Sequence, residues 1–525
     1  MRPMNLVLAV FFIALLYLLP SYDKCWAPYD EGDYLNTSMM VLKGMTPYKD
    51  YFLIMYPPGH AYTLAALLKV FGMHLYVGRF YNIIVLSVIL ATVFYIAGKV
   101  ASRGWALFSF VMCLGVFSSL GEPSIPRAIW PGVMWSMITL ACLLEFIEKE
   151  KTGYLAAASV SLGITLIFRH DIAFLTFLSG CVGLTAHALY GPRRGAAGRI
   201  AVRSVGLAAG PVICAVLLTA WLYRMGALND AFRAMFVEPS AFHRWGAIPF
   251  PPYIQDPGAI FHRGCIFIRH NKFYIPVIIC ASSVFLFISD IFIKKRLDKR
   301  LVLLSGIITL AVLYLQQLVF RVDDNHLAVS FAPSAVLLGS LFSHRAESRN
   351  RPFKVLEMAM LSYVGLLAAL LLYHSTERYI KDIYTKPFVK KEVEPAVFER
   401  GTIYIPDDVR PVFVELEKFI RENTAGDERI YIGPLRHNVP QIGWFDLLYF
   451  LTDRVPAVKY YVMIPGFQTR RDIQEEMIRS LEINNTRFLF LRDFGRSEDG
   501  LLDTYIKERY SLVKVIDSYY IYGKR

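Results

Sequence analysis

Long apolar runs alternate with short charged segments over the first three quarters of the chain. Runs such as 202–223, 273–293 and 355–373 have the length of about 20 residues that a helix needs to cross a hydrocarbon core of about 30 Å. The pattern therefore predicts a polytopic α-helical membrane protein with about eleven spans. They are expected at 4–19, 79–98, 104–120, 129–147, 154–168, 172–190, 201–223, 273–293, 301–320, 326–343 and 354–373.

The first apolar run, 4–19, has a second interpretation as a cleaved signal peptide. The run is long for the apolar part of a signal peptide, and no small-x-small cleavage site follows it. We therefore expect this run to be the first membrane span.

Two shorter apolar segments lie between the first two predicted spans. The segment 60–71 has about a dozen residues, too few to cross a membrane. In the segment 34–42, Leu35, Met39 and Leu42 recur at helical spacing. If 60–71 crossed the membrane, every later loop would change sides. We expect both segments to form helices in the membrane interface, within a long first outer loop at 20–78.

Basic residues gather in alternate loops between the predicted spans. The positive-inside rule places these loops in the cytoplasm, so the N-terminus is also expected there and the acidic loops outside. The acidic loops hold Asp23, Asp30, Glu31, Asp33, Glu122, Asp171, Asp323 and Asp324. The cytoplasmic loops hold Lys99, Arg103, Lys149, Lys151, Arg193, Arg194, Arg199, Arg203, Lys294, Lys295, Arg296, Lys299, Arg300, Arg345, Arg349, Arg351 and Lys354.

The composition changes after the last predicted span. Residues 375–525 have the mixed charge of globular sequence, with helical patterns at 411–423 and 469–481 and β-rich segments at 429–432, 487–491 and 512–516. Strands that alternate with helices favour a small α/β domain. We expect a membrane region at 1–374 and an extracytoplasmic domain at 375–525.

The composition of the chain also limits the classes of function that it could have. The chain of 525 residues is 55% hydrophobic and 19% charged, whereas soluble domains are about 25% charged. The net charge of +13 could suggest nucleic acid, but the basic residues lie in short loops and not on one soluble face. We therefore expect no nucleic-acid partner.

The seven cysteines do not indicate a metal or redox site. Most of them, for example Cys113, Cys142, Cys181 and Cys214, lie in apolar runs, and no Cys-x-x-Cys spacing occurs. Cys25 and Cys265 both fall in predicted outer loops, which leaves a disulfide between them open.

The most acidic short segment follows the first predicted span. Asp30, Glu31 and Asp33 lie within four residues. A carboxylate there could deprotonate an acceptor hydroxyl, and partial burial would raise its pKa toward the working range. The alternative is a solvated acidic turn that only satisfies the charge rule.

Further polar residues stand near span ends on the same predicted face. Charges at such depth are costly unless they are paired or lie in a wet cavity. Arg169 and Asp171 could form a structural ion pair, or Arg169 could bind an anion such as a phosphate. The candidate substrate-binding residues are Lys49, Tyr56, Arg127, Arg169, His170, Asp171, Arg321, Asp324 and His326.

The predicted outer loop at 224–272 could bind an anionic head group or form an interfacial girdle. Its polar members are Glu238, His243, Arg244, His262, Arg263, Arg269, His270 and Lys272. No metal-ligand spacing stands out, although Asp323 with Asp324, or Asp30 with Asp33, could hold a cation. We expect no metal site and no cofactor, with a divalent cation left open.

Several segments of the first outer loop together resemble a known family. They are Asp30-Glu31-Gly32, the run LKGMTPYKDY at 42–51, the run YPPGH at 56–60 and the run KVFG at 69–72. They are similar to the first outer loop of GT-C glycosyltransferases, in the bacterial branch of protein mannosyltransferases and aminoarabinose transferases. The segments at 168–171 and 321–326 are similar to recurring patterns of the same family.

The resemblance implies an inverting transfer of a sugar from a polyprenyl-phosphate donor to a hydroxyl or amine of a lipid, glycan or protein acceptor. The reaction would take place at the outer face of the cytoplasmic membrane. Asp30 matches the family's catalytic aspartate as general base, and Glu31 would orient it or bind the acceptor. Relatives often carry lysine before the double proline, where this chain has Tyr56. Arg169, Arg321 and Lys49 are the candidates to neutralise the leaving phosphate instead.

Two other classes of function remain as alternatives. A transporter or lipid flippase would also be polytopic, but such proteins often show inverted repeats and broken mid-membrane helices, and the sequence shows neither. A structural or sensory protein, with a C-terminal domain that binds a partner, leaves Arg169 and Arg321 at the span ends unexplained.

Overall fold

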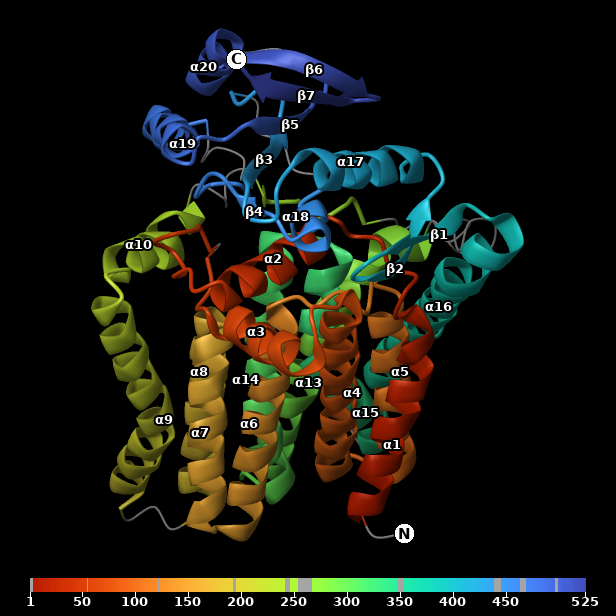
Figure 1. Ribbon diagram of the computed structural model, residues 1–525. Helices are drawn as coiled ribbons and strands as arrows, with labels where there is room; N and C mark the ends of the chain where they lie inside the picture. Colours follow the sequence, from red (N-terminus) through yellow and green to blue (C-terminus); the bar gives the residue numbers. More distant parts are fainter. Residues whose placement is uncertain are drawn as a thin grey trace.

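A bundle of long helices carries a smaller α/β region on one of its two ends (Figure 1). The computed structural model describes residues 3–53, 55–120, 122–191, 195–240, 246–253, 267–347, 354–438, 445–462, 469–495 and 499–525. The N-terminus lies at the end of the bundle opposite to the α/β region.

The predicted spans coincide with helices of the bundle. Within the described residues, nine helices are long and apolar enough to cross a membrane, and α5 and α7 are shorter apolar helices. The fold class is confirmed as a polytopic helical membrane protein. The bundle helices are α1 (Pro3–Leu18), α4 (Leu75–Val100), α5 (Arg103–Ser118), α6 (Ile129–Lys149), α7 (Thr152–Phe168), α8 (His170–Tyr190), α9 (Ala196–Arg224), α13 (Ile275–Lys294), α14 (Lys299–Phe320), α15 (Asp324–Glu347) and α16 (Lys354–Ile380).

Central and peripheral helices of the bundle differ in burial. The apolar window of α15 is 89% buried inside the protein, whereas that of α9 is 11% buried and that of α16 is 28% buried. A helix that is apolar all round must meet either other helices or lipid. The peripheral helices α9 and α16 therefore present their apolar side chains to the membrane.

Two short helices lie across the bundle at the end that carries the α/β region (Figure 1). They are α2 (Asp30–Leu42) and α3 (Gly59–Phe71), each of 13 residues, and they correspond to the two predicted interfacial segments. The structure corrects the surroundings of α2. Leu35 and Met39 are fully buried, while Leu42 is 37% exposed, because α2 is covered by the C-terminal region and does not lie on an open membrane surface.

The C-terminal region contains a mixed sheet with helices around it. Strands β3 (Arg429–Pro434), β4 (Val455–Pro456) and β5 (Phe488–Arg492) are parallel, and β7 (Tyr519–Lys524) is antiparallel to both β5 and β6 (Tyr510–Ile516), in the order β4-β3-β5-β7-β6. A separate hairpin joins β1 (Val393–Phe398) and β2 (Gly401–Pro406). The helices are α17 (Arg410–Asn423), α18 (Leu447–Thr452), α19 (Arg471–Ile483) and α20 (Leu501–Arg509).

The C-terminal region and the first loop share one hydrophobic core. Leu35 and Met39 of α2 pack in the same cluster as Phe413 of α17 and Tyr449 of α18. Gly32 lies so close to the α18 backbone that a Cβ atom there would be 2.1 Å from Leu447 N. Leu447 N also donates to Pro28 O at 2.9 Å. The start of α2 therefore packs directly against the backbone of α18.

Some sequence expectations concern residues that the structure does not describe. Cys265, His243, Arg244, His262 and Arg263 lie outside the described residues, as do Arg193, Arg194, Arg349 and Arg351. Cys25 itself is buried and donates to Ser21 O at 3.4 Å. Burial raises the pKa of the Cys25 thiol to about 11.

Candidate active site

A cavity of about 280 Å³ opens where the start of α2 meets three helix corners of the bundle. The corners join α5 to α6, α7 to α8, and α14 to α15. Each contributes an arginine, namely Arg127, Arg169 and Arg321. The remaining lining residues are Tyr29, Asp30, Asp33, Tyr34, Thr37, Leu53, Met55, Tyr56, Pro57, His60, Ala61, Ala128, Ile129, Phe320, Asp323, Asn325 and His326.

Asp30 is the first residue of α2 and is the half-exposed carboxylate of this cavity, with 41% of its side chain accessible. Arg127 holds it, because Nε and Nη2 of Arg127 donate to Asp30 Oδ2 at 3.0 and 2.8 Å. Arg127 also binds Glu122, while its Nη1 is buried without a hydrogen-bond partner among the described residues. The pair leaves Asp30 Oδ1 and one guanidinium nitrogen for other partners.

Arg169 stands at the corner between α7 and α8. Its backbone is extended (φ −149°, ψ 98°), which ends one helix and starts the next without a loop. The side chain is 4% exposed and donates from Nε and Nη2 to the two oxygens of Asp171 at 2.8 and 2.6 Å. Its guanidinium also lies over the ring of Tyr56, 4.1 Å from the centroid. Tyr56 therefore supports the arginine by a cation–π contact.

Arg321 repeats this arrangement at the corner between α14 and α15. Its backbone is again extended (φ −147°, ψ 114°), and its Nε donates to Asp323 Oδ2 at 2.8 Å. His326 Nδ1 lies 2.7 Å from Asp323 Oδ1. Burial alone would raise the pKa of Asp323, but the contacts with His326 and Arg321 lower it to about 2. Both corners thus present an arginine whose charge is balanced by an aspartate two residues later.

The predicted residues divide into those at the cavity and those away from it. Asp30, Tyr56, Arg127, Arg169, Arg321 and His326 line it. His170 and Asp171 line an adjoining cavity of about 260 Å³ that shares Tyr56, Arg169 and His326 with the first.

Glu31, Lys49 and Asp324 were predicted at the site but lie elsewhere. Glu31 is fully buried and accepts hydrogen bonds from Nε and Nη2 of Arg79, both at 2.7 Å. It points away from the cavity because consecutive residues of a helix face different directions. Lys49 Nζ contacts Met225 O at 3.4 Å, and Asp324 pairs with Lys272 and Arg378.

Asp33 was predicted as part of the acidic segment but without a role at the site; it lies one helical turn after Asp30 and lines the cavity. Tyr461 of the C-terminal region donates to Asp33 Oδ1 at 2.8 Å. Burial is the main influence on Asp33 and raises its pKa to about 7, against the lowering effect of this hydrogen bond. The spacing Asp30-x-x-Asp33 was the available signal, since i and i+3 share a helix face.

Asp446, immediately before α18, is a second acid that the sequence did not reveal. It is fully buried, and neither carboxylate oxygen has a hydrogen-bond partner among the described residues. Burial, followed by repulsion from Asp33 and Asp30, raises the pKa of Asp446 well above its ordinary value. Burial and the neighbouring carboxylates therefore favour the neutral form of this carboxyl.

His60 is a further lining residue that sequence reasoning passed over. Its Nε2 lies 2.7 Å from Pro126 O, and burial lowers its pKa to about 4. The ring is thus neutral and donates to the carbonyl. Among the described residues, no three His, Cys, Asp or Glu side chains are grouped as metal ligands.

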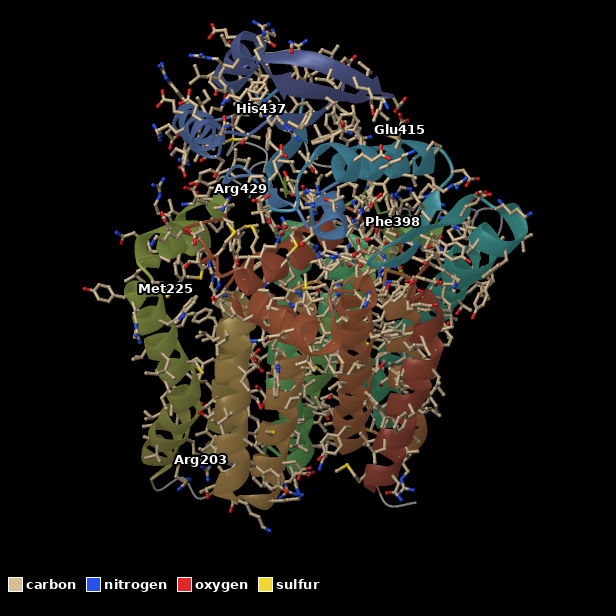
Figure 2. All side chains as sticks on the ribbon, in the orientation of Figure 1. Arg203, Met225, Phe398, Glu415, Arg429 and His437 are labelled. Atoms are coloured by element: carbon tan, nitrogen blue, oxygen red, sulfur yellow. The ribbon has the colours of Figure 1, made fainter. Side chains whose placement is uncertain are left out.

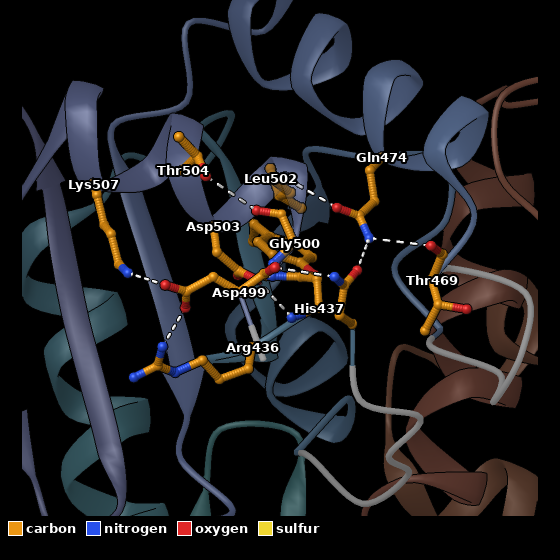
Figure 3. Close-up of polar contacts among 12 residues, drawn as sticks. Arg436, His437, Thr469, Gln474, Asp499, Gly500, Leu502, Asp503, Thr504 and Lys507 are labelled. Carbon is orange, nitrogen blue, oxygen red and sulfur yellow. Dashed lines mark hydrogen bonds and ion pairs between the residues drawn. The ribbon is translucent and has the colours of Figure 1, made fainter. Parts of the chain in front are cut away.

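A separate polar network stabilises the C-terminal region (Figure 3). His437 is fully buried between Tyr431 Oη, 2.8 Å from its Nε2, and Asp503, whose carboxylate also accepts from the backbone nitrogens of His437 and Gly500. Figure 2 labels His437 well above the helical bundle. We interpret this network as structural, since each polar group is satisfied by another part of the same region.

No protein-family model matches the sequence, and no match is found among curated proteins. Solved structures do match. ArnT from Cupriavidus metallidurans in the apo state has a TM-score of 0.54 at 13% identity, over 100% of this chain and 98% of that one. The same protein bound to undecaprenyl phosphate has a TM-score of 0.52 at 12% identity, over 99% and 98%.

A second similar structure is the archaeal oligosaccharyltransferase AglB from Archaeoglobus fulgidus, in complex with an inhibitory peptide and a dolichol-phosphate. Its TM-score is 0.53 at 12% identity, over 93% of this chain and 69% of that chain. At these identities the likeness concerns the fold. The chain has the fold of the GT-C membrane glycosyltransferases.

Proposed function

We propose that this protein is an inverting glycosyltransferase that moves a sugar from a polyprenyl-phosphate donor to a hydroxyl or amine of an acceptor. The observation that carries the proposal is the placement of Asp30 in one cavity with Arg127, Arg169 and Arg321. A carboxylate and several guanidinium groups are what the transfer requires, since an acceptor proton must leave and a phosphate charge must be neutralised.

Asp30 is the general base of the proposed reaction. Its carboxylate is half exposed to the cavity and uses only Oδ2 in the pair with Arg127. Oδ1 can accept the proton of an acceptor hydroxyl as its oxygen attacks the anomeric carbon. The bond from that carbon to the phosphate oxygen breaks on the opposite face, so the configuration inverts, and the phosphate leaves with the electron pair.

The departing phosphate is bound by the two corner arginines. Arg169 and Arg321 each carry five N–H donors and use only part of them for Asp171 and Asp323. The fold similarity to a structure with undecaprenyl phosphate and to one with a dolichol-phosphate supports a lipid-phosphate donor. By the distribution of basic loops, this end of the bundle faces the outside of the cytoplasmic membrane.

Replacement of the base tests the proposal. Purified wild-type protein and the variant Asp30→Asn are incubated with a panel of undecaprenyl-phosphate monosaccharides in lipid vesicles, and release of undecaprenyl phosphate is followed. The variant should lose transfer by about 10² to 10⁴-fold. The anomeric configuration of the wild-type product, from proton NMR, should be opposite to that of the donor.

The matched control is Asp230→Asn, because Asp230 also pairs with one cation (Lys459) and has a similar side-chain exposure of 43%. It should transfer at the wild-type rate. Full activity of Asp30→Asn, or retention of configuration, would refute the assignment. The transporter alternative gains no support from the described residues, whose buried arginines converge on one end of the bundle.

A further inference from the structure

A second charged cavity, of about 560 Å³, lies beside the candidate active site. It is bounded by the start of α13, the start of α15, the last turns of α16 and the π-helical segment η4 (Lys381–Lys390). Asp323 lines both cavities. Because Asp323 binds Arg321 and His326 on the first side, these ion pairs form the wall between the two.

The second cavity contains more cations than two of its aspartates, Asp324 and Asp382, pair with. Asp324 binds both Lys272 and Arg378, and Asp382 binds Arg378 and Lys386. Lys272 is 7% exposed, so its charge is held in place by Asp324. These two aspartates are therefore already neutralised from within the protein, and Glu377, a further carboxylate of the lining, also has an interaction of its own within the protein.

Within the part of the chain that the structure describes, Arg269 and Lys381 are the cations of this cavity that have no ion-pair partner. Both are exposed, and neither has an ion-pair partner among the residues that the structure describes. His374 adds a buried ring nitrogen, Nδ1, without a hydrogen-bond partner among the same residues. Two unpaired cations and a buried imidazole nitrogen favour an anionic ligand with several oxygen acceptors.

The apolar surroundings indicate that this ligand is a lipid. Helix α16, which contributes His374, Glu377 and Arg378 to the lining, is a peripheral helix of the bundle. On and just beyond α16, Tyr373, Ile380 and Tyr384 are 64%, 49% and 45% exposed. Charged pockets between membrane helices, next to exposed apolar surface, suit a phosphate head group with its acyl chains in the membrane.

We propose that this second cavity binds the phosphate head group of an anionic membrane lipid, at a site separate from that of the sugar donor. Arg269 and Lys381 bind the phosphate oxygens, and the acyl chains lie along the exposed face of α16. The site does not rest on the proposed transfer reaction, because lipid binding can be measured without a sugar donor.

The test measures lipid binding by the full-length protein. Delipidated wild-type protein and the double variant Arg269→Gln, Lys381→Gln are titrated with dioleoyl phosphatidylglycerol and, separately, with dioleoyl phosphatidylcholine, by native mass spectrometry. The double variant should bind phosphatidylglycerol about tenfold more weakly or worse. Phosphatidylcholine should bind both proteins weakly and equally.

The matched control is the double variant Lys390→Gln, Lys391→Gln, which removes two charges at the end of η4 outside the cavity. It should bind phosphatidylglycerol as the wild type does. An equal loss in the control, or wild-type affinity in the Arg269 and Lys381 variant, would overturn the proposal. Displacement of phosphatidylglycerol by millimolar inorganic phosphate would also overturn it, because the cavity would then be a site for small anions.

Discussion

The two ends of the helical bundle both carry many charges, but they hold them differently. At the basic end, where Figure 2 labels Arg203, Glu145 accepts from Lys99, Lys149 and Tyr95, and Lys149 is 47% exposed. At the cavity end, beneath the C-terminal region, Arg79, Arg127 and Arg169 are at most 7% exposed. Each of these buried arginines has a carboxylate partner.

The difference shows which property separates a charge that sets topology from a charge that serves a site. Cations of the basic end remain close to water and need no fixed geometry. Arginines of the cavity end are desolvated, which is favourable only when hydrogen bonds fix them in place. Burial and pairing, and not the number of charges, therefore distinguish the cavity end of the bundle from the basic end.

The largest effect that the comparison predicts concerns a buried pair that does not touch the cavity. Glu31→Ala leaves Arg79 fully buried without its carboxylate. We expect the free energy of unfolding to fall by about 3–5 kcal/mol, because the buried charge of Arg79 would have no carboxylate to compensate it. Thermal unfolding in detergent measures it, with Glu148→Ala at the basic end as the control. A shift no larger than that of the control would contradict the structural role of Glu31.

The next effect separates binding from folding at the cavity end. Arg169→Lys keeps the positive charge but loses the bidentate bonds to Asp171 and the stacking on Tyr56. We expect transfer from a polyprenyl-phosphate sugar to fall about 10² to 10³-fold, with a small change in melting temperature. Unaltered transfer would show that Arg169 is a structural cation like those of the basic end.

A pH dependence of stability should follow from Asp33. Its pKa in the folded protein is about 7, compared with an ordinary value of 3.8. Between these values the unfolded chain binds fewer protons than the folded one, so wild-type stability falls as pH rises from about 4 to about 7. Asp33→Asn should remove this slope and melt higher than wild type at pH 8. Equal melting curves of the two proteins across this range would contradict it.

The smallest effect belongs to the basic end. Lys99→Gln removes a cation that contacts Glu145 and Glu148 with 18% of its side chain exposed. Glu145 keeps Lys149 as a partner, so we expect a stability change of about 1 kcal/mol or less. Transfer should stay at the wild-type rate in the same vesicle assay. A large loss of sugar transfer in this variant would contradict the expectation that cations of the basic end do not contribute to the reaction.

The sequence predicted local features well because membrane spans are specified by their own composition. The helices at 4–19 through 354–373 and the two short segments before Leu75 follow from length and apolar periodicity. The arginines at 169 and 321 could be found because each interrupts two apolar runs. The positions of charged residues at span ends were therefore visible in the sequence.

Pairings between distant segments were not visible. Glu31 and Arg79 are 48 residues apart, and Asp30 and Arg127 are 97 apart, and nothing in their local patterns indicates a partner. The packing of the C-terminal region over α2 was missed for the same reason. Apolar residues such as Leu35 and Met39 give the same sequence pattern whether they face lipid or protein. Asp446 lies in a loop whose burial depends on this packing.

The close packing of α2 against α18 has a consequence for biosynthesis. Asp30 leaves the ribosome before the backbone around Leu447 that fits against Gly32, which is translated more than four hundred residues later. The helix that carries Asp30 therefore completes its packing only after the C-terminal region has been translated and has folded over it. A nascent or truncated chain without this region would leave the start of α2 without its packing partner.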